Sequence, residues 1–207
     1  MKILVTGFEP FSTHSVNPSQ KIVEALSTDK FLGVDLQTLV LPVDHVRAPG
    51  IITETIRKDQ PDAILAFGLA SSRFKIGLER VAINLMDFKI PDNSGTQIVD
   101  QLIVEKGPAA YFTTLPARSL LPLLQEEGIP VEISLTAGSY LCNLVFYTMM
   151  HEISLQAKPI QAGFIHLPAL PEEAAKSDKT LPSLSLELDL NAARIMINYL
   201  AQNLRRN

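Results

Sequence analysis

Short, mostly apolar runs alternate along this chain with segments that are apolar on one side only. The runs indicate buried strands, and they cover residues 3–6, 34–43, 63–68, 81–88, 131–135 and 162–166. The one-sided segments have apolar residues at helical spacing, and they cover residues 18–26, 44–58, 115–127, 140–149 and 186–204. Strands that lack a polar face must be covered on both sides, as in a mainly parallel sheet between two layers of helices. The pattern therefore predicts a single α/β domain, residues 1–207, with three layers (α/β/α) around a mainly parallel twisted sheet.

The composition is typical of a globular protein with a sizeable core. Apolar residues make up 46% of the 207 residues, charged residues 19%, and the net charge is −4. Because the basic residues are scattered, the sequence argues against a nucleic-acid surface. No apolar stretch reaches the length of a membrane-spanning helix, and the polar, proline-bearing segment 171–182 is expected to be a surface loop. One cysteine cannot form an internal disulfide, and the apolar start is too short for a signal peptide, so we expect a cytoplasmic location.

The single cysteine, Cys142, lies at the start of a predicted helix. The strand-like run 131–135 ends before it, residues 136–139 break the apolar pattern, and the helical pattern begins near Tyr140. A thiol in the first turn of a helix lies near the positive end of the helix dipole, which favours the reactive thiolate. We therefore expect Cys142 to be a nucleophile. The alternative is a buried and inert core residue, which is the common state of a free cysteine.

A cysteine nucleophile needs a base within reach and a group that orients this base. In a sheet of this kind, functional groups gather beyond the carboxyl ends of the strands. His166 ends a predicted strand and is the best placed of the four histidines, since His151 lies about two and a half turns beyond Cys142. Glu79 follows the strand that ends at Gly68. The alternative for His166 is a strand-end histidine that bonds only the backbone.

Five sequence blocks, in the same order, resemble those of the pyroglutamyl peptidase I (pyrrolidone-carboxylate peptidase) family of cysteine peptidases. The cysteine block is SLTAGSYLCN at residues 134–143, and the histidine block is GFIHLP at residues 163–168. The others are TGFEPF with NPS at 6–11 and 17–19, the segment 73–84 that contains ERVAIN, and IPDN at 90–93. The resemblance spans nearly the whole chain, and the family's usual length is similar.

The resemblance implies an exopeptidase that removes an amino-terminal pyroglutamyl residue from peptides. It implies Cys142 as the nucleophile, His166 as the base and then the acid, and Glu79 as the carboxylate that orients His166. Asp92 in the IPDN block is the competing candidate for the third role, although an aspartate in such a turn commonly bonds the local backbone. The resemblance also implies a homotetramer without a metal or other cofactor. The expected partners are pyroglutamyl peptides, not nucleic acid or membranes.

A pyroglutamyl group is a flat, neutral lactam, so its pocket needs apolar faces and a few amide partners. Phe8 and Phe11 could supply these faces, and backbone groups near Gly68 and Leu69 could bond the ring amide. Asn17 lies in a block that is similar to the family's and is a further candidate. The alternative for the two phenylalanines is that they are loop residues tucked into the core, and this applies more to Phe8.

Four positions depart from the family pattern. Ser12 and Thr13 replace a pair of glycines, Leu69 replaces a glutamine, and Lys89 replaces an arginine. These differences predict a changed pocket or a changed efficiency, because none of them falls on the three implied catalytic residues.

Two other classes of function stay open on the sequence. The family resembles purine nucleoside phosphorylases in fold, so a small-molecule enzyme is one alternative, although the first loop has no glycine-rich phosphate cradle. The other is an inactive homologue in which Cys142 is structural. The chain has no G-x-G-x-x-G motif after a strand and no G-x-S-x-G motif around Ser139, which argues against a dinucleotide enzyme and a serine hydrolase.

Overall fold

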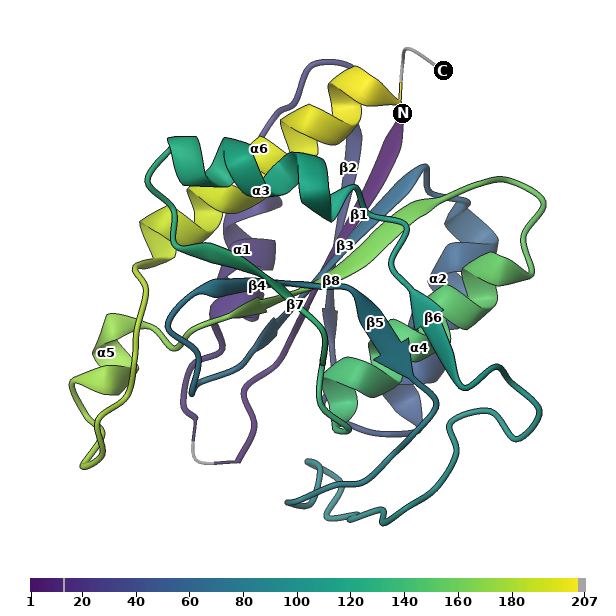
Figure 1. Ribbon diagram of the computed structural model, residues 1–207, viewed down its shortest axis with the longest axis vertical. Helices are drawn as coiled ribbons and strands as arrows, with labels where there is room; N and C mark the ends of the chain where they lie inside the picture. The colour runs from purple at the N-terminus through teal and green to yellow at the C-terminus, as the bar shows by residue number, and fades with distance from the viewer. Residues whose placement is uncertain (13, 205–207) are drawn as a thin grey trace.

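A six-stranded sheet forms the centre of the molecule (Figure 1). The computed structural model describes residues 1–12 and 14–204. The strands of the sheet lie in the order β2-β1-β3-β8-β4-β7. Their bounds are β1 Lys2–Phe8, β2 Asp35–Leu41, β3 Ala63–Leu69, β4 Ile76–Glu79, β7 Val131–Ser134 and β8 Gln161–Leu167. A separate two-stranded ribbon pairs β5, Val81–Ile83, with β6, Ala110–Phe112.

The sheet is mainly parallel. Strands β2, β1, β3 and β8 all run in one direction. Strand β4 is antiparallel to β8, and β7 is parallel to β4, so these two strands run the opposite way. The predicted α/β class with a mainly parallel sheet is therefore confirmed.

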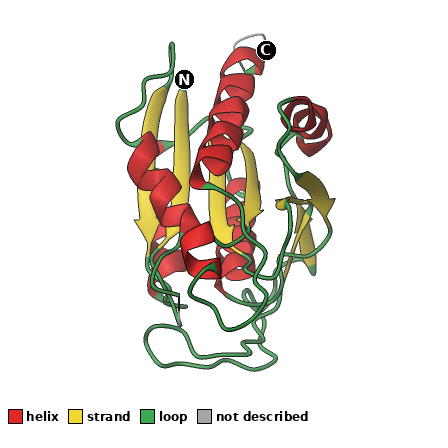
Figure 2. Cartoon of the chain, turned by 90° about the vertical axis from the view of Figure 1, so that its left-hand side faces the viewer, coloured by secondary structure: helices red, strands yellow, loops and turns green. Residues whose placement is uncertain are grey.

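Helices cover both faces of the sheet, which Figure 2 shows from the side. One face holds α1 (Pro18–Leu26), α3 (Ala117–Glu126) and α6 (Leu186–Asn203), and the other holds α2 (Arg47–Asp59) and α4 (Leu141–Ser154). Successive side chains of a strand point to opposite faces. Ile3 and Val5 accordingly pack in the first core and Leu4 in the second, all at most 1% exposed. Burial on both faces explains why these strands are apolar throughout.

Four segments differ from the prediction, and one of them is strand β6, which the pattern did not indicate. Residues 81–88 form a strand only over Val81–Ile83, because the Asn143 amide then donates to the Ile83 and Leu85 oxygens in place of a sheet partner. Strand β4 was not indicated by the pattern, since a glycine and a glutamate interrupt its short apolar run. The segment expected to be a surface loop, 171–182, begins with the short helix α5, Pro171–Ala174.

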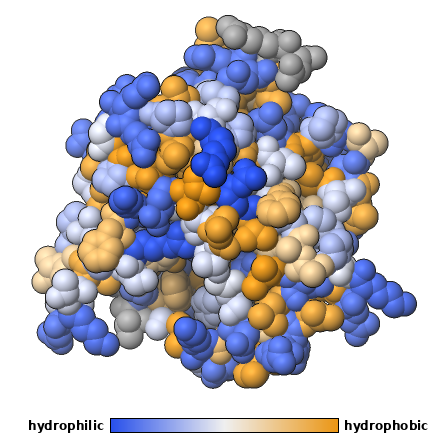
Figure 3. All heavy atoms as spheres, viewed as in Figure 1, coloured by the Kyte–Doolittle hydropathy of each residue, from blue (hydrophilic) through white to orange (hydrophobic). Residues whose placement is uncertain are grey.

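Apolar side chains also lie on the surface. The face shown in Figure 3 carries several hydrophobic patches between hydrophilic side chains. Phe74, Phe112 and Leu135 are each more than two-thirds exposed. Within the described ranges, no helix combines the length and the apolar character that crossing a membrane requires.

Candidate active site

The sheet brings His166 and Glu79 into contact, although 86 residues separate them along the chain. His166 is near the end of β8 and Glu79 is the last residue of the antiparallel neighbour β4. The His166 Nδ1 atom lies 2.7 Å from Glu79 Oε1. The two residues are 4% and 1% exposed, so the pair is shielded from water. Because the Glu79 carboxylate is hydrogen-bonded to Nδ1, Nε2 is the ring nitrogen of His166 that can accept a proton.

Glycines flank His166 on both neighbouring strands. Gly68 of β3 and Gly77 of β4 are its partners in the sheet register. A Cβ atom on Gly68 would lie 2.9 Å from Cys142 Sγ and 2.7 Å from the ring of Phe164. A Cβ atom on Gly77 would collide with the Arg73 guanidinium. The missing side chains therefore make room for the groups that surround the histidine.

Cys142 is the second residue of α4 and lies over Gly68. Tyr140, in extended conformation, precedes the helix as its N-cap residue. The Phe164 ring lies next to both Gly68 and the His166 ring, with a centroid distance of 5.0 Å to the latter. Cys142, Phe164 and His166 thus meet over one glycine of the sheet, as the predicted grouping of Cys142 and His166 requires.

The expectation that the resting cysteine is a thiolate is wrong. Burial and, to a smaller extent, the nearby Glu79 carboxylate raise the pKa of the Cys142 thiol to about 12. The Arg73 guanidinium and the backbone N–H of Cys142 lower this pKa, but they do not compensate for the loss of water. At neutral pH the sulfur therefore carries its proton, and a base must remove it.

His166 is suited to remove that proton. Burial lowers the pKa of the His166 imidazole below its usual 6.5, against the hydrogen bond and the charge of Glu79, which raise it. The imidazole is consequently neutral at pH 7. It becomes a cation when it takes up a proton, and the Glu79 carboxylate then stabilises that cation.

Arg73 fixes Glu79 from the other side. Its Nη2 atom lies 2.7 Å from Glu79 Oε1 and donates to the Thr136 oxygen at 2.9 Å. Glu79 Oε1 is thus in contact with both Arg73 and His166. The buried Oε2 atom has no hydrogen-bond partner among the described residues. Sequence reasoning did not assign Arg73 a role. The position of Arg73 at the start of the sequence block that contains Glu79 could have indicated such a role.

A small pocket next to the sulfur contains most of the predicted substrate-binding residues. We call it the cysteine pocket, and it is lined by Phe8, Phe11, Asn17, Val43, Leu69, Tyr140, Leu141 and Cys142. Four of the five candidates are among them, and the fifth, Gly68, lies beneath Cys142. No charged side chain of the described residues lines this pocket, which suits a neutral and flat ligand.

The aromatic residues and Asn17 shape the cysteine pocket in different ways. Phe8 is 2% exposed and belongs to the core, while Phe11 is partly exposed and lies 6.0 Å from the Tyr140 ring. Asn17 caps α1 by accepting from Ser19 N, and its amide donates to Glu9 O, so it holds the loop in place. Tyr140 was missed as a lining residue, although its position two residues before Cys142 was a signal.

Of the departures from the family pattern, Leu69 lines this pocket. Ser12 has a φ of 53°, a left-handed conformation that glycine adopts freely and serine adopts at a cost of about 1 kcal/mol. Leu69 lines the cysteine pocket and is 6% exposed. Lys89 is exposed. Thr13 lies outside the described residues.

The other candidate carboxylate, Asp92, contacts a different histidine. Asp92 Oδ2 lies 2.7 Å from His45 Nδ1 and accepts from His45 N, while Oδ1 accepts from Ser94 and Thr96. Asp44, His45 and Asp92 have the composition of a metal site, but both Asp92 oxygens accept hydrogen bonds, and Asp44 Oδ1 accepts from Val46 N and Arg47 N. The cluster is therefore explained by local structure.

The two remaining histidines lie apart from Cys142. His151 Nδ1 bonds the Tyr111 hydroxyl at 2.8 Å, and His14 Nδ1 lies 3.3 Å from Glu173 Oε2. His166 is thus the histidine that the sheet places beside the sulfur.

Replacing Gly68 by alanine is expected to destabilise the protein by about 1–3 kcal/mol, because the new methyl group overlaps Phe164 and Cys142. Gly50→Ala is the matched control. It lies inside α2 with nothing within 4 Å of the new methyl group, and it should be neutral or stabilising. Urea unfolding of both variants measures the difference. Equal stability of the two would mean that the space over Gly68 is not tightly filled.

Comparisons with known proteins agree over the whole chain. A family model described as pyroglutamyl peptidase matches residues 1–203. A pyrrolidone-carboxylate peptidase of Vibrio vulnificus is 42% identical over 196 residues, which are 95% of this chain and 91% of that protein. A crystal structure of a mutant pyrrolidone carboxyl peptidase from Pyrococcus furiosus has a TM-score of 0.94 at 39% identity, with 99% and 100% of the two chains covered. The pyroglutamyl peptidase I of Bacillus amyloliquefaciens has a TM-score of 0.89 at 41% identity, with 94% and 92% covered.

Proposed function

The chain belongs to the pyroglutamyl peptidase family, a family of hydrolases, and we propose that Cys142, His166 and Glu79 carry out its removal of amino-terminal pyroglutamate from peptides. The observation that carries this assignment is the contact between His166 and Glu79 beside a sulfur that faces an apolar pocket. The family match favours a peptidase over a phosphorylase-like enzyme on a similar sheet.

The proposed reaction begins with proton transfer from Cys142 Sγ to His166 Nε2 as the sulfur attacks the pyroglutamyl carbonyl carbon. The backbone N–H of Cys142, in the first turn of α4, can donate to the developing oxyanion. When the tetrahedral adduct collapses, the C–N bond breaks and His166 gives its proton to the leaving amine. Water then attacks the thioester, His166 accepts a proton from the water, and this proton returns to the sulfur as pyroglutamate leaves.

The role proposed for Glu79 follows from the pKa values. The thiol starts with a high pKa and the imidazole with a low one, so the ion pair is costly to form. Glu79 stabilises the imidazolium, and Arg73 holds the carboxylate in the required position. The charged pair therefore exists chiefly during the reaction and not at rest.

The cysteine pocket explains the preference for pyroglutamate. An ordinary amino terminus is a cation, and burying it in a pocket without a charged partner costs several kcal/mol. The lactam ring has no such charge. Leu69, which lines this pocket where the family has a glutamine, leaves its own backbone groups for bonding to the ring amide.

Release of a fluorophore from pyroglutamyl, alanyl and prolyl amides under reducing conditions tests the function. The prolyl compound is a ring of similar size that carries a charge. We expect turnover of the pyroglutamyl compound alone. Equal turnover of the prolyl compound would contradict the argument that the pocket excludes a charged amino terminus. An absence of turnover by the folded protein would indicate an inactive homologue.

The pH profile of kcat/KM should show an acid limb with its midpoint below pH 6.5. Since the folded pKa of His166 is lowered, the neutral base persists below pH 6.5, and activity disappears only as the pH falls through this lowered value. Glu79→Gln removes the group that raises this pKa, so the limb should move to still lower pH. Glu132→Gln, an exposed glutamate on β7, is the control and should leave the limb in place. A limb above pH 7 would exclude His166 as the buried base.

We also propose a homotetrameric assembly and a cytoplasmic location for this protein. A homotetramer, as the resemblance implies, would give Phe74, Phe112 and Leu135 a partner surface. A cytoplasmic location agrees with the single cysteine and the need for a reduced thiol.

A further inference from the structure

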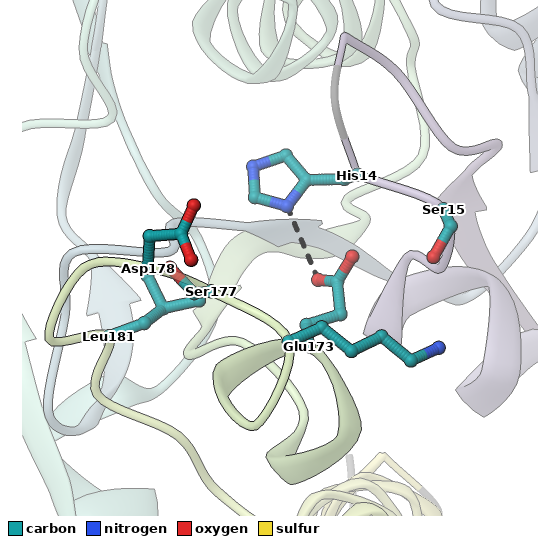
Figure 4. Close-up of a pocket in the computed structure, with 7 residues that line it drawn as sticks. His14, Ser15, Glu173, Ser177, Asp178 and Leu181 are labelled. Carbon is teal, nitrogen blue, oxygen red and sulfur yellow. Dashed lines mark hydrogen bonds and ion pairs between the residues drawn. The ribbon is translucent and has the colours of Figure 1, made fainter.

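A second hollow lies beside the active site and has no part in the mechanism above. We call it the outer cavity, and its volume is about 400 Å³. In Figure 4, His14 and Ser15 lie on one side of it, and Glu173, Ser177, Asp178 and Leu181 lie on the other. Lys176 completes the lining. Its walls are thus mostly polar, in contrast to those of the cysteine pocket.

The two walls of the outer cavity continue strands that carry the active site. One wall is formed by His14 and Ser15, in the segment that follows β1, and the other belongs to the segment 168–184, which follows β8 directly after His166 and Leu167. Glu173 joins the walls, because its carboxylate accepts from Val16 N at 3.4 Å and lies 3.3 Å from His14 Nδ1. A bridge between Ala169 and Ser183 closes the base of the second wall. The cavity is therefore fixed relative to His166.

The loop 9–17 also separates the outer cavity from the cysteine pocket. The Phe11 ring, which lines the cysteine pocket, lies 5.5 Å from the His14 ring, which lines the outer cavity. Figure 1 shows this loop between α5 and the start of α4. The two hollows are therefore separated by the Phe11 and His14 rings. An extended peptide advances about 3.3–3.6 Å per residue, so a few residues of a chain held at Cys142 span a separation of this kind.

We propose that the outer cavity binds the leaving peptide, namely the main chain of about the second and third residues after the bond that is cut. This inference rests on the proposed peptidase function and adds a binding site to it. Peptide groups need both donors and acceptors, and the lining supplies two hydroxyls, two carboxylates and one ammonium group. Because the charges are of both signs, the site recognises the peptide backbone more than any one side chain. The only apolar side chain of the lining is Leu181.

Substrate length tests this inference. The series is pyroglutamyl-Ala-amide, pyroglutamyl-Ala-Ala-amide, pyroglutamyl-Ala-Ala-Ala-amide and the next longer member, with released pyroglutamate measured by chromatography. We expect kcat/KM to rise by about threefold to tenfold for each added residue that gains a hydrogen bond in the cavity, and then to level off. A fluorogenic pyroglutamyl amide, which has no peptide after the cut bond, reports the basal activity.

A bulky side chain in the outer cavity should abolish only the rise of kcat/KM with the length of the peptide substrate. Leu181→Trp places a large ring in the outer cavity, and it should leave the basal activity unchanged while the longer peptides lose their advantage. Leu155→Trp, at an exposed position after α4, is the matched control and should keep the full gain. If Leu181→Trp fails to fold, Ser177→Trp fills the same space from the same wall.

The outcomes separate the inference from the function it rests on. Basal activity without a gain with length, or a gain that survives in the filled variants, would overturn the proposed site and leave the peptidase assignment intact. An absence of turnover on every substrate would reject the peptidase assignment and the proposed site together.

Discussion

Cys142→Ser is expected to reduce kcat/KM for a pyroglutamyl amide by about 10⁴- to 10⁶-fold. The surroundings raise the pKa of the thiol to about 12, and a hydroxyl in the same place is a far weaker acid. A neutral imidazole with a lowered pKa cannot take the proton of that hydroxyl at a useful rate. Steady-state assays of the purified variant measure the loss.

The control for this variant is Ser139→Ala. Ser139 lies three residues before Cys142, is partly exposed and bonds Asp87 O through its hydroxyl, so its loss should change activity by no more than about twofold. Circular dichroism of both variants checks the fold. If the serine variant retained more than about one per cent of the activity, Cys142 would not be the nucleophile.

The stability of the protein is expected to depend on the pH through Asp189. This residue of α6 is fully buried, and neither carboxylate oxygen has a hydrogen-bond partner among the described residues. Burial raises the pKa of the carboxyl to about 8 in the folded protein, from about 3.8 when exposed. Between these two values the unfolded chain releases a proton that the folded chain keeps, so the folded state loses stability as the pH rises.

Asp189→Asn removes this titration. The free energy of unfolding of the variant relative to the wild type should therefore shift in the variant's favour by about 3–4 kcal/mol between pH 5 and pH 8. Urea unfolding at both pH values gives the four energies that are needed. Asp35→Asn, at an exposed position on β2, should show no such shift. A difference that does not change with pH would show that Asp189 does not keep its proton in the folded state.

Local patterns in the sequence predicted much of the fold, because strands that are buried on both faces are apolar throughout. The same patterns missed β4, whose Gly77 and Glu79 interrupt its apolar run for reasons of the active site. Gly77 leaves room for Arg73, and Glu79 binds His166. A strand shaped by function in this way lacks the apolar signal by which strands are recognised.

The sequence indicated which residues of the candidate site lie together, but it did not indicate their pKa values. Position at a helix start and at a strand end indicated Cys142 and His166, and the family resemblance added Glu79. The helix dipole argument failed for the sulfur because desolvation, which depends on packing from distant parts of the chain, has the larger effect. Arg73 was missed for the same reason, since its contact with the Thr136 oxygen joins segments 63 residues apart.

The position of β8 has a consequence for how the protein is made. This strand is the last of the chain and yet lies in the middle of the sheet, between β3 and β4. Until a ribosome has released residues 161–167, both neighbours present open edges and His166 has no place beside Glu79. Pairings so distant along the chain form slowly because a long loop must close first. A nascent chain therefore cannot cleave peptides before its folding is nearly complete, and recovery of activity reports the last step of refolding.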